Sequence, residues 1–423
     1  MLSSSPPFST CAMVFTSPAW VPELPDIPDN VSLPDFMFEE SHGRHAAVDS
    51  KHPFVDTITA ASSIHRLDGI ATMVNAAYST PELVHQLRSS RAKGIFTCAS
   101  LLPTTIEAVN QVGIPKSRIY ILDVPNVTAA ERRACQGFKT VEQLIVQGSR
   151  LPSIQRVPWA KGQATRQCAF LCYSSGTSGL PKGVMISHRN IMANVVQIKT
   201  YERQYRDTLS PNGRWTEVCL GLLPQSHIYG LVVIAYSSIY RGDSVIVLPK
   251  FEMNSFLDTI QRFRINVLYL VPPIIIQMIN NKELLDKKDL SSVYAIFTGA
   301  APLGGETAAD LQKQYPSWKI RQGYGLTETC TVVCGTSCHD VWLGSSGSLL
   351  PGYKARIVST EGVDLTSYNQ PGELLVCSPS VTLGYLDNEK ATNETFVVDA
   401  NGDRWMRTGD EAVIRKSPSG NEH

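Results

Sequence analysis

Short apolar runs alternate with longer amphipathic segments along most of this chain. The segment Pro81–Ser90 begins with proline and places Leu83, Val84 and Leu87 on one face, which predicts a helix. Similar segments predict helices at Leu231–Tyr240, Asn254–Arg264 and Leu303–Gln314. Short apolar runs predict strands at Ala92–Cys98, Ile119–Val124, Glu217–Leu223, Ser244–Leu248, Val267–Leu270, Ala295–Thr298 and Lys319–Gln322. Such strands, alternating with helices of about ten residues, indicate parallel sheets covered by helices on both faces.

After about residue 340 the pattern changes to short alternating segments between glycine-rich turns. The segments Ala355–Val358, Gly372–Cys377 and Trp405–Thr408 predict a small antiparallel sheet. We therefore expect an α/β fold with two helix-covered, mostly parallel sheets and a small antiparallel β subdomain. The expected parts are a proline-rich, flexible or extended lead-in at 1–35, an α/β body at 36–340 and the β subdomain at 341–423.

Composition and charge narrow the possible partners. The chain has 423 residues, with 38 Lys+Arg and 38 Asp+Glu, so no net field attracts nucleic acid or anionic lipid. Ten cysteines are too few for a disulfide scaffold and indicate reduced thiols. The N-terminus lacks a basic region before a long apolar core, so no secretion signal is predicted. We expect an intracellular protein, cytoplasmic or peroxisomal, that acts on small molecules.

Two other features have plain interpretations. The apolar run Asn266–Ile279 is too short for a membrane span and contains Pro272 and Pro273, so no stable membrane insertion is expected. A cluster of possible metal ligands lies at Cys330, Cys334, Cys338 and His339. Its spacing matches none of the usual zinc patterns, which favours a structural role.

The segment Tyr173–Gly183 (YSSGTSGLPKG) is the most distinctive motif. A strand-like run, Phe170–Ser174, precedes it and a helix-capable run, Val184–Val196, follows it. Glycines let the backbone approach a ligand, amide N–H groups and hydroxyls donate to an anion, and Lys182 supplies a positive charge. Gly183 stands where a P-loop NTPase has Ser or Thr, so the motif is a different one. From these residues alone, a phosphate-binding loop and an ordinary surface loop both remain open.

The sequence of this segment resembles the signature of the adenylate-forming superfamily, which includes acyl-CoA synthetases, 4-coumarate–CoA ligases and firefly luciferase. Similar matches follow in order at Leu223–Gly230 (LPQSHIYG), Thr298–Gly304 (TGAAPLG), Gln322–Glu328 (QGYGLTE) and Arg407–Asp410 (RTGD). Three further segments, Val247–Phe251, Val271–Ile274 and Gly384–Asp387, resemble the coumarate-ligase-like branch. Each short match also has an ordinary interpretation as a turn or a core segment, but together they extend from about residue 20 to the end.

The resemblance implies that ATP activates a carboxylic acid as acyl-AMP, and that the acyl group then passes to the thiol of coenzyme A. It implies catalytic roles for Lys182, His227, Thr327 and Glu328, with Mg²⁺ held by Glu328. The implied nucleotide-binding residues are Ser174, Ser175, Gly176, Thr177, Ser178, Gly179, Lys182, Gly299, Ala300, Ala301, Gln322, Gly323, Tyr324, Thr327 and Asp410. The implied acid-binding residues are His227, Ile228, Tyr229, Thr298, Gly323, Gly325, Val332 and Val333.

The implied acid pocket is mostly apolar, which favours an aromatic or medium-chain acid. Several of its residues could equally be ordinary core residues. The family pattern is broken in two places. Family members continue past the Asp410 motif into a C-terminal domain of roughly 100 residues, for which we expect no counterpart here. Several dozen family residues are also expected to be missing near Thr59–Ile64, which would expose apolar surface.

These departures leave three hypotheses open. The chain is an ATP-dependent acyl-CoA ligase, a truncated non-catalytic relative that binds ATP or acyl-AMP, or a defective relative with no stable fold.

Overall fold

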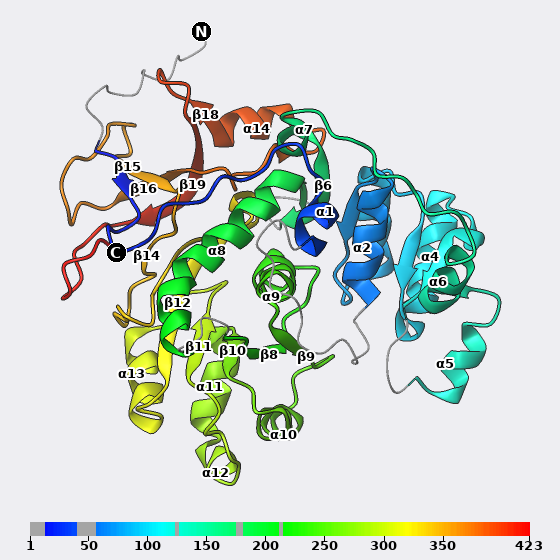
Figure 1. The fold of residues 1–423 in the computed structure, drawn as a ribbon, viewed down its shortest axis with the longest axis horizontal. Coiled ribbons are helices and arrows are strands. Elements are labelled where there is room, and N and C mark those ends of the chain that lie inside the picture. The colour runs from blue at the N-terminus through cyan, green and yellow to red at the C-terminus, as the bar shows by residue number, and fades with distance from the viewer. Residues whose placement is uncertain (1–12, 40–55, 123–126, 175–180, 211–214) are drawn as a thin grey trace.

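The computed structural model describes residues 13–39, 56–122, 127–174, 181–210 and 215–423. Four sheets and the helices around them make up this part of the chain (Figure 1). The predicted α/β class is confirmed, and its strands are distributed over sheets of seven, five, four and three strands. The predicted domain boundaries stay predictions.

The seven-stranded sheet forms the centre of the molecule. Its strands, in spatial order, are β14 (Ser348–Leu349), β13 (Thr331–Gly335), β12 (Lys319–Leu326), β11 (Ala295–Thr298), β10 (Val267–Leu270), β8 (Val218–Gly221) and β9 (Ser244–Val247). The strands from β9 to β12 are parallel to one another, β13 pairs antiparallel with β12, and β14 pairs antiparallel with β13. All residues of β10 and β11 are buried, as expected for strands covered on both faces.

The sequence predicted helices in three of the connections between these strands, but not between β10 and β11. All four connections contain helices. They are the π-helix η4 (Tyr229–Tyr236), α9 (Ser237–Arg241), α10 (Met253–Phe263), α11 (Pro272–Asn280), α12 (Lys282–Leu285) and α13 (Gly305–Gln314). Proline at the start of α11 fits, because the first turn of a helix has no partner for its N–H groups. Within the described ranges, no helix is both long and apolar enough to cross a membrane.

A four-stranded sheet carries the motif predicted to bind phosphate. Its strands, in spatial order, are β17 (Gly384–Tyr385), β7 (Lys182–Ser187), β6 (Cys168–Ser174) and β2 (Ala71–Met73). β6 and β7 form an antiparallel hairpin, and each residue of β7 has a partner on β6. The loop between them, residues 175–180, lies outside the described residues.

The prediction that this loop leads into a helix at Val184 is wrong. The run Val184–Ile186 fits a strand as well as a helix, and pairing with β6 decides in favour of the strand. The helix α8 (His188–Thr208) starts only after Ser187, which caps it. Ser187 Oγ accepts from the N–H of Asn190 at 3.1 Å, and the N–H of Ser187 donates to Asn190 Oδ1 at 2.8 Å.

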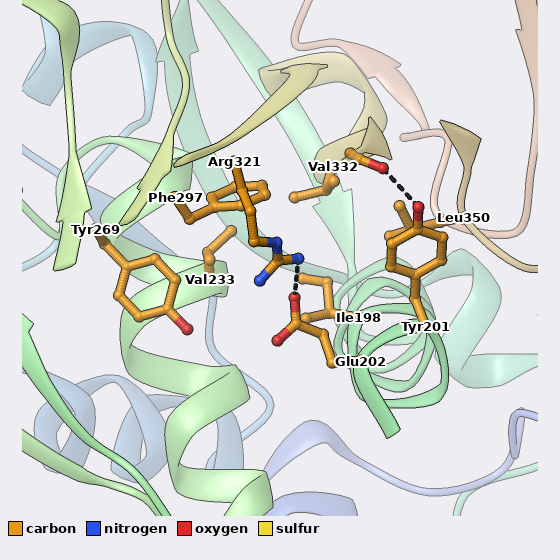
Figure 2. A pocket seen from close by; sticks show the side chains of 10 residues that line it. Ile198, Tyr201, Glu202, Val233, Tyr269, Phe297, Arg321, Val332 and Leu350 are labelled. Atoms are coloured by element: carbon orange, nitrogen blue, oxygen red, sulfur yellow. Dashed lines mark hydrogen bonds and ion pairs between the residues drawn. The ribbon is translucent and has the colours of Figure 1, made fainter. Parts of the chain in front are cut away.

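Helix α8 joins the sheets to one another. Most of its residues are buried, including three amides that donate to backbone carbonyl groups of other elements. Asn190 donates to Pro379 and Val381, Asn194 to Val332, and Gln197 to Pro351. Tyr201 O–H donates to the carbonyl of Gly335 at 2.6 Å (Figure 2). These buried polar groups are satisfied, so they fix the position of the helix without a large desolvation cost.

Two smaller sheets complete the fold. The parallel three-stranded sheet consists of β3 (Ile95–Thr97), β4 (Ile119–Ile121) and β5 (Lys139–Thr140). The helices that precede, connect and follow these strands in the sequence are α3 (Thr80–Ser89), η2 (Ala99–Leu101), α4 (Leu102–Val112), η3 (Lys116–Arg118), α5 (Ala129–Ala134) and α6 (Val141–Gly148), of which η2 and η3 are 3-10 helices. The antiparallel five-stranded sheet consists of β1 (Phe15–Thr16), β15 (Lys354–Val358), β16 (Gly372–Cys377), β19 (Arg404–Ala412) and β18 (Phe396–Val398), with α14 (Glu389–Thr395) before β18. This second sheet is the predicted antiparallel sheet, and β1 adds a strand from the proline-rich segment.

A single helix covers the position near Thr59–Ile64 where family residues are expected to be missing. Helix α2 (Asp56–Arg66) runs through it without interruption. Helix α1 (Leu33–Phe38) packs against α2 and α8, and α7 (Gln163–Arg166) packs against α8 and β7. Directly after α2, Leu67 and Ile70 are 67% and 51% exposed. Apolar side chains are thus open to solvent at this point of the chain.

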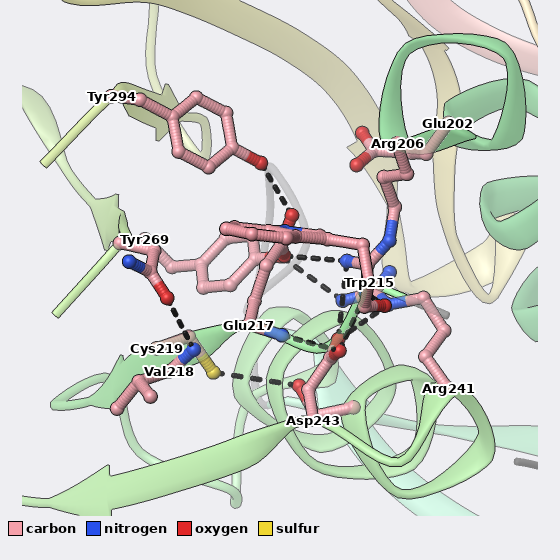
Figure 3. Close-up of polar contacts among 12 residues, drawn as sticks. Glu202, Arg206, Trp215, Glu217, Val218, Cys219, Arg241, Asp243, Tyr269 and Tyr294 are labelled. Carbon is pink, nitrogen blue, oxygen red and sulfur yellow. Dashed lines mark hydrogen bonds and ion pairs between the residues drawn. The ribbon is translucent and has the colours of Figure 1, made fainter. Parts of the chain in front are cut away.

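A buried charge cluster ties the C-terminal end of α8 to β8 and β9 (Figure 3). Arg206 contacts Glu217 at 2.6 Å and Asp243 at 2.5 Å, and Arg241 contacts Asp243 at 2.7 Å. Tyr294 O–H donates to the Glu217 carboxylate. All four charged side chains are at most 8% exposed, so each depends on its partners to offset the loss of water.

Candidate active site

A cleft of about 680 Å³ brings together residues from motifs that are far apart in the sequence. It is lined from β6 and β7 on one side, from β11, β12 and β13 on another, and from β19. The predicted site residues that line it are Ser174, Lys182, His227, Ile228, Tyr229, Gly299, Ala300, Gly323, Tyr324, Gly325, Thr327, Glu328, Val332 and Asp410. The five motifs therefore meet in one place.

Four predicted site residues are outside this lining. Ala301 is exposed, and Val333 is completely buried in the core. Thr298 is also completely buried, and its hydroxyl has no partner among the described residues. Gln322 uses its side chain locally, since Oε1 accepts from the N–H of Leu303 at 2.7 Å and Nε2 donates to a carbonyl. The predicted residues Ser175, Gly176, Thr177, Ser178 and Gly179 lie outside the described residues.

At one end of the cleft, Lys182 and Glu328 lie near one shared tyrosine. Ser174 and Lys182 are paired across the hairpin. Ser174 O–H and Tyr385 O–H each donate to Glu328 Oε1 at 3.0 Å, and the Lys182 ammonium lies 5.1 Å from the centre of the Tyr385 ring. Burial and the Glu328 carboxylate raise the pKa of Tyr385, so its hydroxyl stays protonated and can donate.

The donor set at Glu328 fits the predicted magnesium ion. The side chain is only 8% exposed, and the hydrogen bonds described for its carboxylate both end on Oε1. Among the described residues none donates a hydrogen bond to Oε2, so this oxygen remains as a ligand for a hard cation. Mg²⁺ is commonly held by one or two carboxylates together with phosphate oxygens of a substrate. No group of three or more His, Cys, Asp or Glu is placed to hold a metal ion in the described part of the chain, so substrate phosphate oxygens would have to complete the ligands at Glu328.

At another end, Tyr324 and Asp410 form a hydrogen-bonded pair. Tyr324 O–H donates to Asp410 Oδ2 at 2.6 Å, and Asp410 N–H donates to Thr408 Oγ1 at 3.1 Å. Burial and the Asp410 carboxylate raise the pKa of Tyr324, which keeps the phenol neutral. Ala300, on the cleft wall, has φ of 67°, in the region that a side chain makes costly. The tight turn after β11 therefore presents backbone to the cleft.

We expect Tyr324→Phe to weaken ATP binding by roughly 3- to 10-fold, because one hydrogen bond contributes about 0.5–1.5 kcal/mol net and this one orients Asp410. Isothermal titration calorimetry with ATP measures the effect. Tyr368→Phe is the matched control, because Tyr368 also donates to a carboxylate, that of Glu422, away from the cleft. Equal affinity of Tyr324→Phe and the unmodified chain would contradict the assignment.

The third part of the cleft is apolar and starts at His227. Burial lowers the pKa of His227, and its Nδ1 accepts from the N–H of Tyr229 at 3.3 Å, so the ring is neutral near pH 7. Tyr229 begins the π-helix η4, a rare form that is frequent at functional sites. Its hydroxyl donates to the carbonyl of Phe297 at 2.8 Å.

Backbone strain occurs at the same end of the cleft. Thr331 has φ of 106°, which is unfavourable for a β-branched residue, and its hydroxyl donates to the carbonyl of Ile228 at 3.2 Å. A Cβ atom on Gly325 would lie 1.5 Å from the carbonyl oxygen of Thr331. Only glycine fits there, so Gly325, Thr331 and Ile228 form one tightly coupled wall.

Comparison with protein families identifies the chain. Residues 52–386 match the family model described as AMP-binding enzyme. The chain belongs to this family.

The most similar relatives of this AMP-binding enzyme that we compared are named acyl-CoA ligases. Acyl-CoA ligase easD of Emericella nidulans is 37% identical over 462 positions, covering 97% of the chain and 80% of the relative. Acyl-CoA ligase AFT1-1 of Alternaria alternata is 37% identical over 464 positions, covering 97% and 78%. The chain is accordingly an acid–CoA ligase of the AMP-forming class. Both alignments span more positions than the 423 residues of this chain. The relatives therefore contain residues within the aligned range that this chain lacks.

Solved structures agree on the fold of the AMP-binding enzyme. A long-chain-fatty-acid-CoA ligase from Archaeoglobus fulgidus has a TM-score of 0.76 at 19% identity, covering 96% of this chain and 86% of that one. An anthranilate CoA ligase in complex with anthranoyl-AMP also has 0.76 at 19%, covering 94% and 78%. At this identity the likeness shows the fold alone.

The sequence motifs missed several residues of the cleft. Tyr385 lies in the family-like segment Gly384–Asp387, for which the sequence predicts no role. Its hydroxyl group is the feature of that segment that could have suggested a hydrogen bond in the site. Phe297 comes one residue before the Thr298–Gly304 motif and falls in the predicted apolar strand Ala295–Thr298, where its residue type gives no sign of a site. Other lining residues without a sequence-based role are Leu326, Thr331, Glu373, Glu394, Thr395, Met406, Arg407, Thr408 and Gly409.

Proposed function

We propose that the cleft binds ATP and a carboxylic acid, forms acyl-AMP, and transfers the acyl group to coenzyme A. The observation that carries this proposal is the arrangement of three different surfaces in one cleft. A cation and a carboxylate, Lys182 and Glu328, lie at one end, and the Tyr324–Asp410 pair lies at another. The apolar wall that starts at His227 supplies the third surface.

In the first step, a carboxylate oxygen forms a bond to the α-phosphorus of ATP while the bond from that phosphorus to the bridging oxygen breaks. Pyrophosphate leaves, and the product is acyl-AMP. In this proposal Lys182 neutralises phosphate charge, Thr327 donates to the α-phosphate and Asp410 accepts from the ribose hydroxyls. Glu328 would hold Mg²⁺, which when bound neutralises charge on the phosphate oxygens.

In the second step, the coenzyme A thiol loses its proton to water and its sulfur attacks the acyl carbon. The bond from that carbon to the phosphate oxygen breaks, and AMP leaves. The neutral ring of His227, at the junction of the polar and apolar surfaces, orients the carboxyl group in both steps. Its Nε2 remains for this contact, because Nδ1 already accepts from Tyr229.

The acid in this proposal is a monocarboxylic acid with an aromatic or aliphatic body. Ile228, Val332 and Phe297 line the acid end and carry no charge. We also propose an intracellular location, cytoplasmic or peroxisomal. Burial raises the thiol pKa of Cys172 and Cys219 to about 12, which suits unreactive cysteines in a reducing compartment.

Pyrophosphate release tests this function. We expect release that requires both ATP and an added acid, followed by a coenzyme A thioester that mass spectrometry detects. ATP binding by calorimetry without pyrophosphate release from any acid of a broad panel would favour the non-catalytic alternative. Failure to bind ATP at all would overturn both.

A further inference from the structure

A second, internal cavity of about 20 Å³ lies behind the acid end of the cleft (Figure 2). Its lining comes from α8, η4, β10, β11, β12 and β13. Phe297 and Val332 line both this cavity and the cleft, so they separate the two. The cavity is large enough for about one water molecule or one methyl group.

Three neighbouring side chains hold the ring of Phe297 in the partition. It contacts the rings of Tyr229 and Tyr269 edge-on, each at 6.3 Å between centres, and the Arg321 guanidinium lies 5.2 Å from its centre. A Cβ atom on Gly323 would lie 2.3 Å from Phe297 Cζ, so the ring fills the space that this glycine leaves.

The floor of the internal cavity carries an ion pair. Arg321 donates to Glu202 at 2.5 Å and to the carbonyl of Thr336 at 2.7 Å, and the side chains of Arg321 and Glu202 are only 6% and 14% exposed. Because these charges already neutralise each other, the cavity has no spare charge to offer a charged group. The remaining wall carries the apolar side chains of Ile198, Val233 and Leu350 (Figure 2). It also carries two tyrosines whose hydroxyls are already hydrogen-bonded, Tyr201 to Gly335 and Tyr269 to Arg241. A group that enters past Phe297 must therefore be an apolar chain end.

We propose that the Phe297 ring is the end wall that limits the length of the acid, and that the internal cavity is a continuation of the acid pocket closed by this ring. The inference rests on the proposed function. Val332 is the smaller part of the wall, and both hydrogen-bonding groups of its backbone are fixed by Asn194. Removal of the Phe297 ring joins the cavity to the cleft and admits longer chains.

Calorimetry with acyl-sulfamoyl-adenosines tests this inference without the need for turnover. These stable analogues of acyl-AMP are prepared as a series of saturated chains from acetyl to hexadecanoyl. In the unmodified protein, affinity should rise about fourfold per methylene up to a limit and then fall. In Phe297→Ala the limit moves to longer chains, and the first chain that the unmodified protein excludes binds roughly 10- to 200-fold more tightly.

Phe263→Ala is the matched control. Phe263 also lies beneath a guanidinium, with Arg262 at 5.0 Å, but it is 39% exposed on α10. We expect it to leave the length limit unchanged. Phe297→Leu replaces the alanine variant if that variant does not fold, with a smaller shift in the same direction.

Two results would overturn the inference, and they separate it from the proposed function. If the length limit is unchanged in the Phe297 variants while the unmodified protein releases pyrophosphate normally, the role of Phe297 as the end wall is overturned and the proposed function is not. Failure of the unmodified protein to bind any analogue overturns both.

Discussion

Glu328→Gln should lower kcat/KM for acid-dependent pyrophosphate release by roughly 100- to 1,000-fold, the usual loss when one preorganised electrostatic contact to a transition state is removed. The amide keeps the shape of the side chain and can still accept from Ser174 and Tyr385, so the fold is preserved. It loses the negative charge that a magnesium ion requires. A coupled assay of pyrophosphate release over a range of magnesium concentrations measures the change.

Glu394→Gln is the control for this prediction. Glu394 also lines the cleft, but its side chain is 66% exposed and pairs weakly with Lys390 at 3.9 Å. Its replacement should leave kcat/KM nearly unchanged, since exposed ion pairs contribute little. Similar losses in both variants would show that the effect comes from the overall charge of the cleft and would contradict the role of Glu328.

Asp243→Ala has the largest expected effect on stability. Its carboxylate contacts both Arg206 and Arg241 and also accepts from the N–H of Glu217 at 3.0 Å. Its removal leaves two buried guanidinium groups short of a counter-charge, which costs about 3–5 kcal/mol of unfolding free energy. Since whole domains are stable by only about 5–15 kcal/mol, the variant should unfold at a much lower urea concentration, as circular dichroism would show.

Asp289→Ala is the matched control, because Asp289 pairs with Arg264 on the surface, where both side chains are more than half exposed. Its urea midpoint should equal that of the unmodified chain, and a comparable loss in both variants would contradict the argument from burial.

The buried carboxylate of Asp243 also predicts a pH dependence of stability. Burial alone would raise the pKa of Asp243, but Arg241 and Arg206 outweigh it and lower the pKa below its ordinary value of 3.8. The stabilisation is therefore present above that value and is lost as the pH falls through the lower pKa of the folded state.

The sequence predicted where the motifs would meet more reliably than it predicted local structure. The strands β10, β11 and β12 could be placed because short apolar runs between helices have few alternatives. Motifs at the ends of parallel strands then fall at one edge of the sheet, which explains why the residues of Thr298–Gly304 and Gln322–Glu328 line one cleft.

Other features depend on tertiary contacts that a sequence pattern does not contain. The run Val184–Ile186 is apolar enough for a helix or a strand, and only its pairing with β6 made it a strand. Gln322 was expected to face the nucleotide, but its amide stabilises the backbone at Leu303. Phe297 has the composition of a core residue, and its position between two cavities becomes visible only in three dimensions.

The wall formed by Gly325, Thr331 and Ile228 bears on how this enzyme can diverge in evolution. A side chain at Gly325 would displace Thr331, which is already strained, and through its hydroxyl would pull on Ile228. Single substitutions there destroy the pocket before they can reshape it. Drift and laboratory selection for new acids therefore have to act on other side chains of the acid end, such as Phe297.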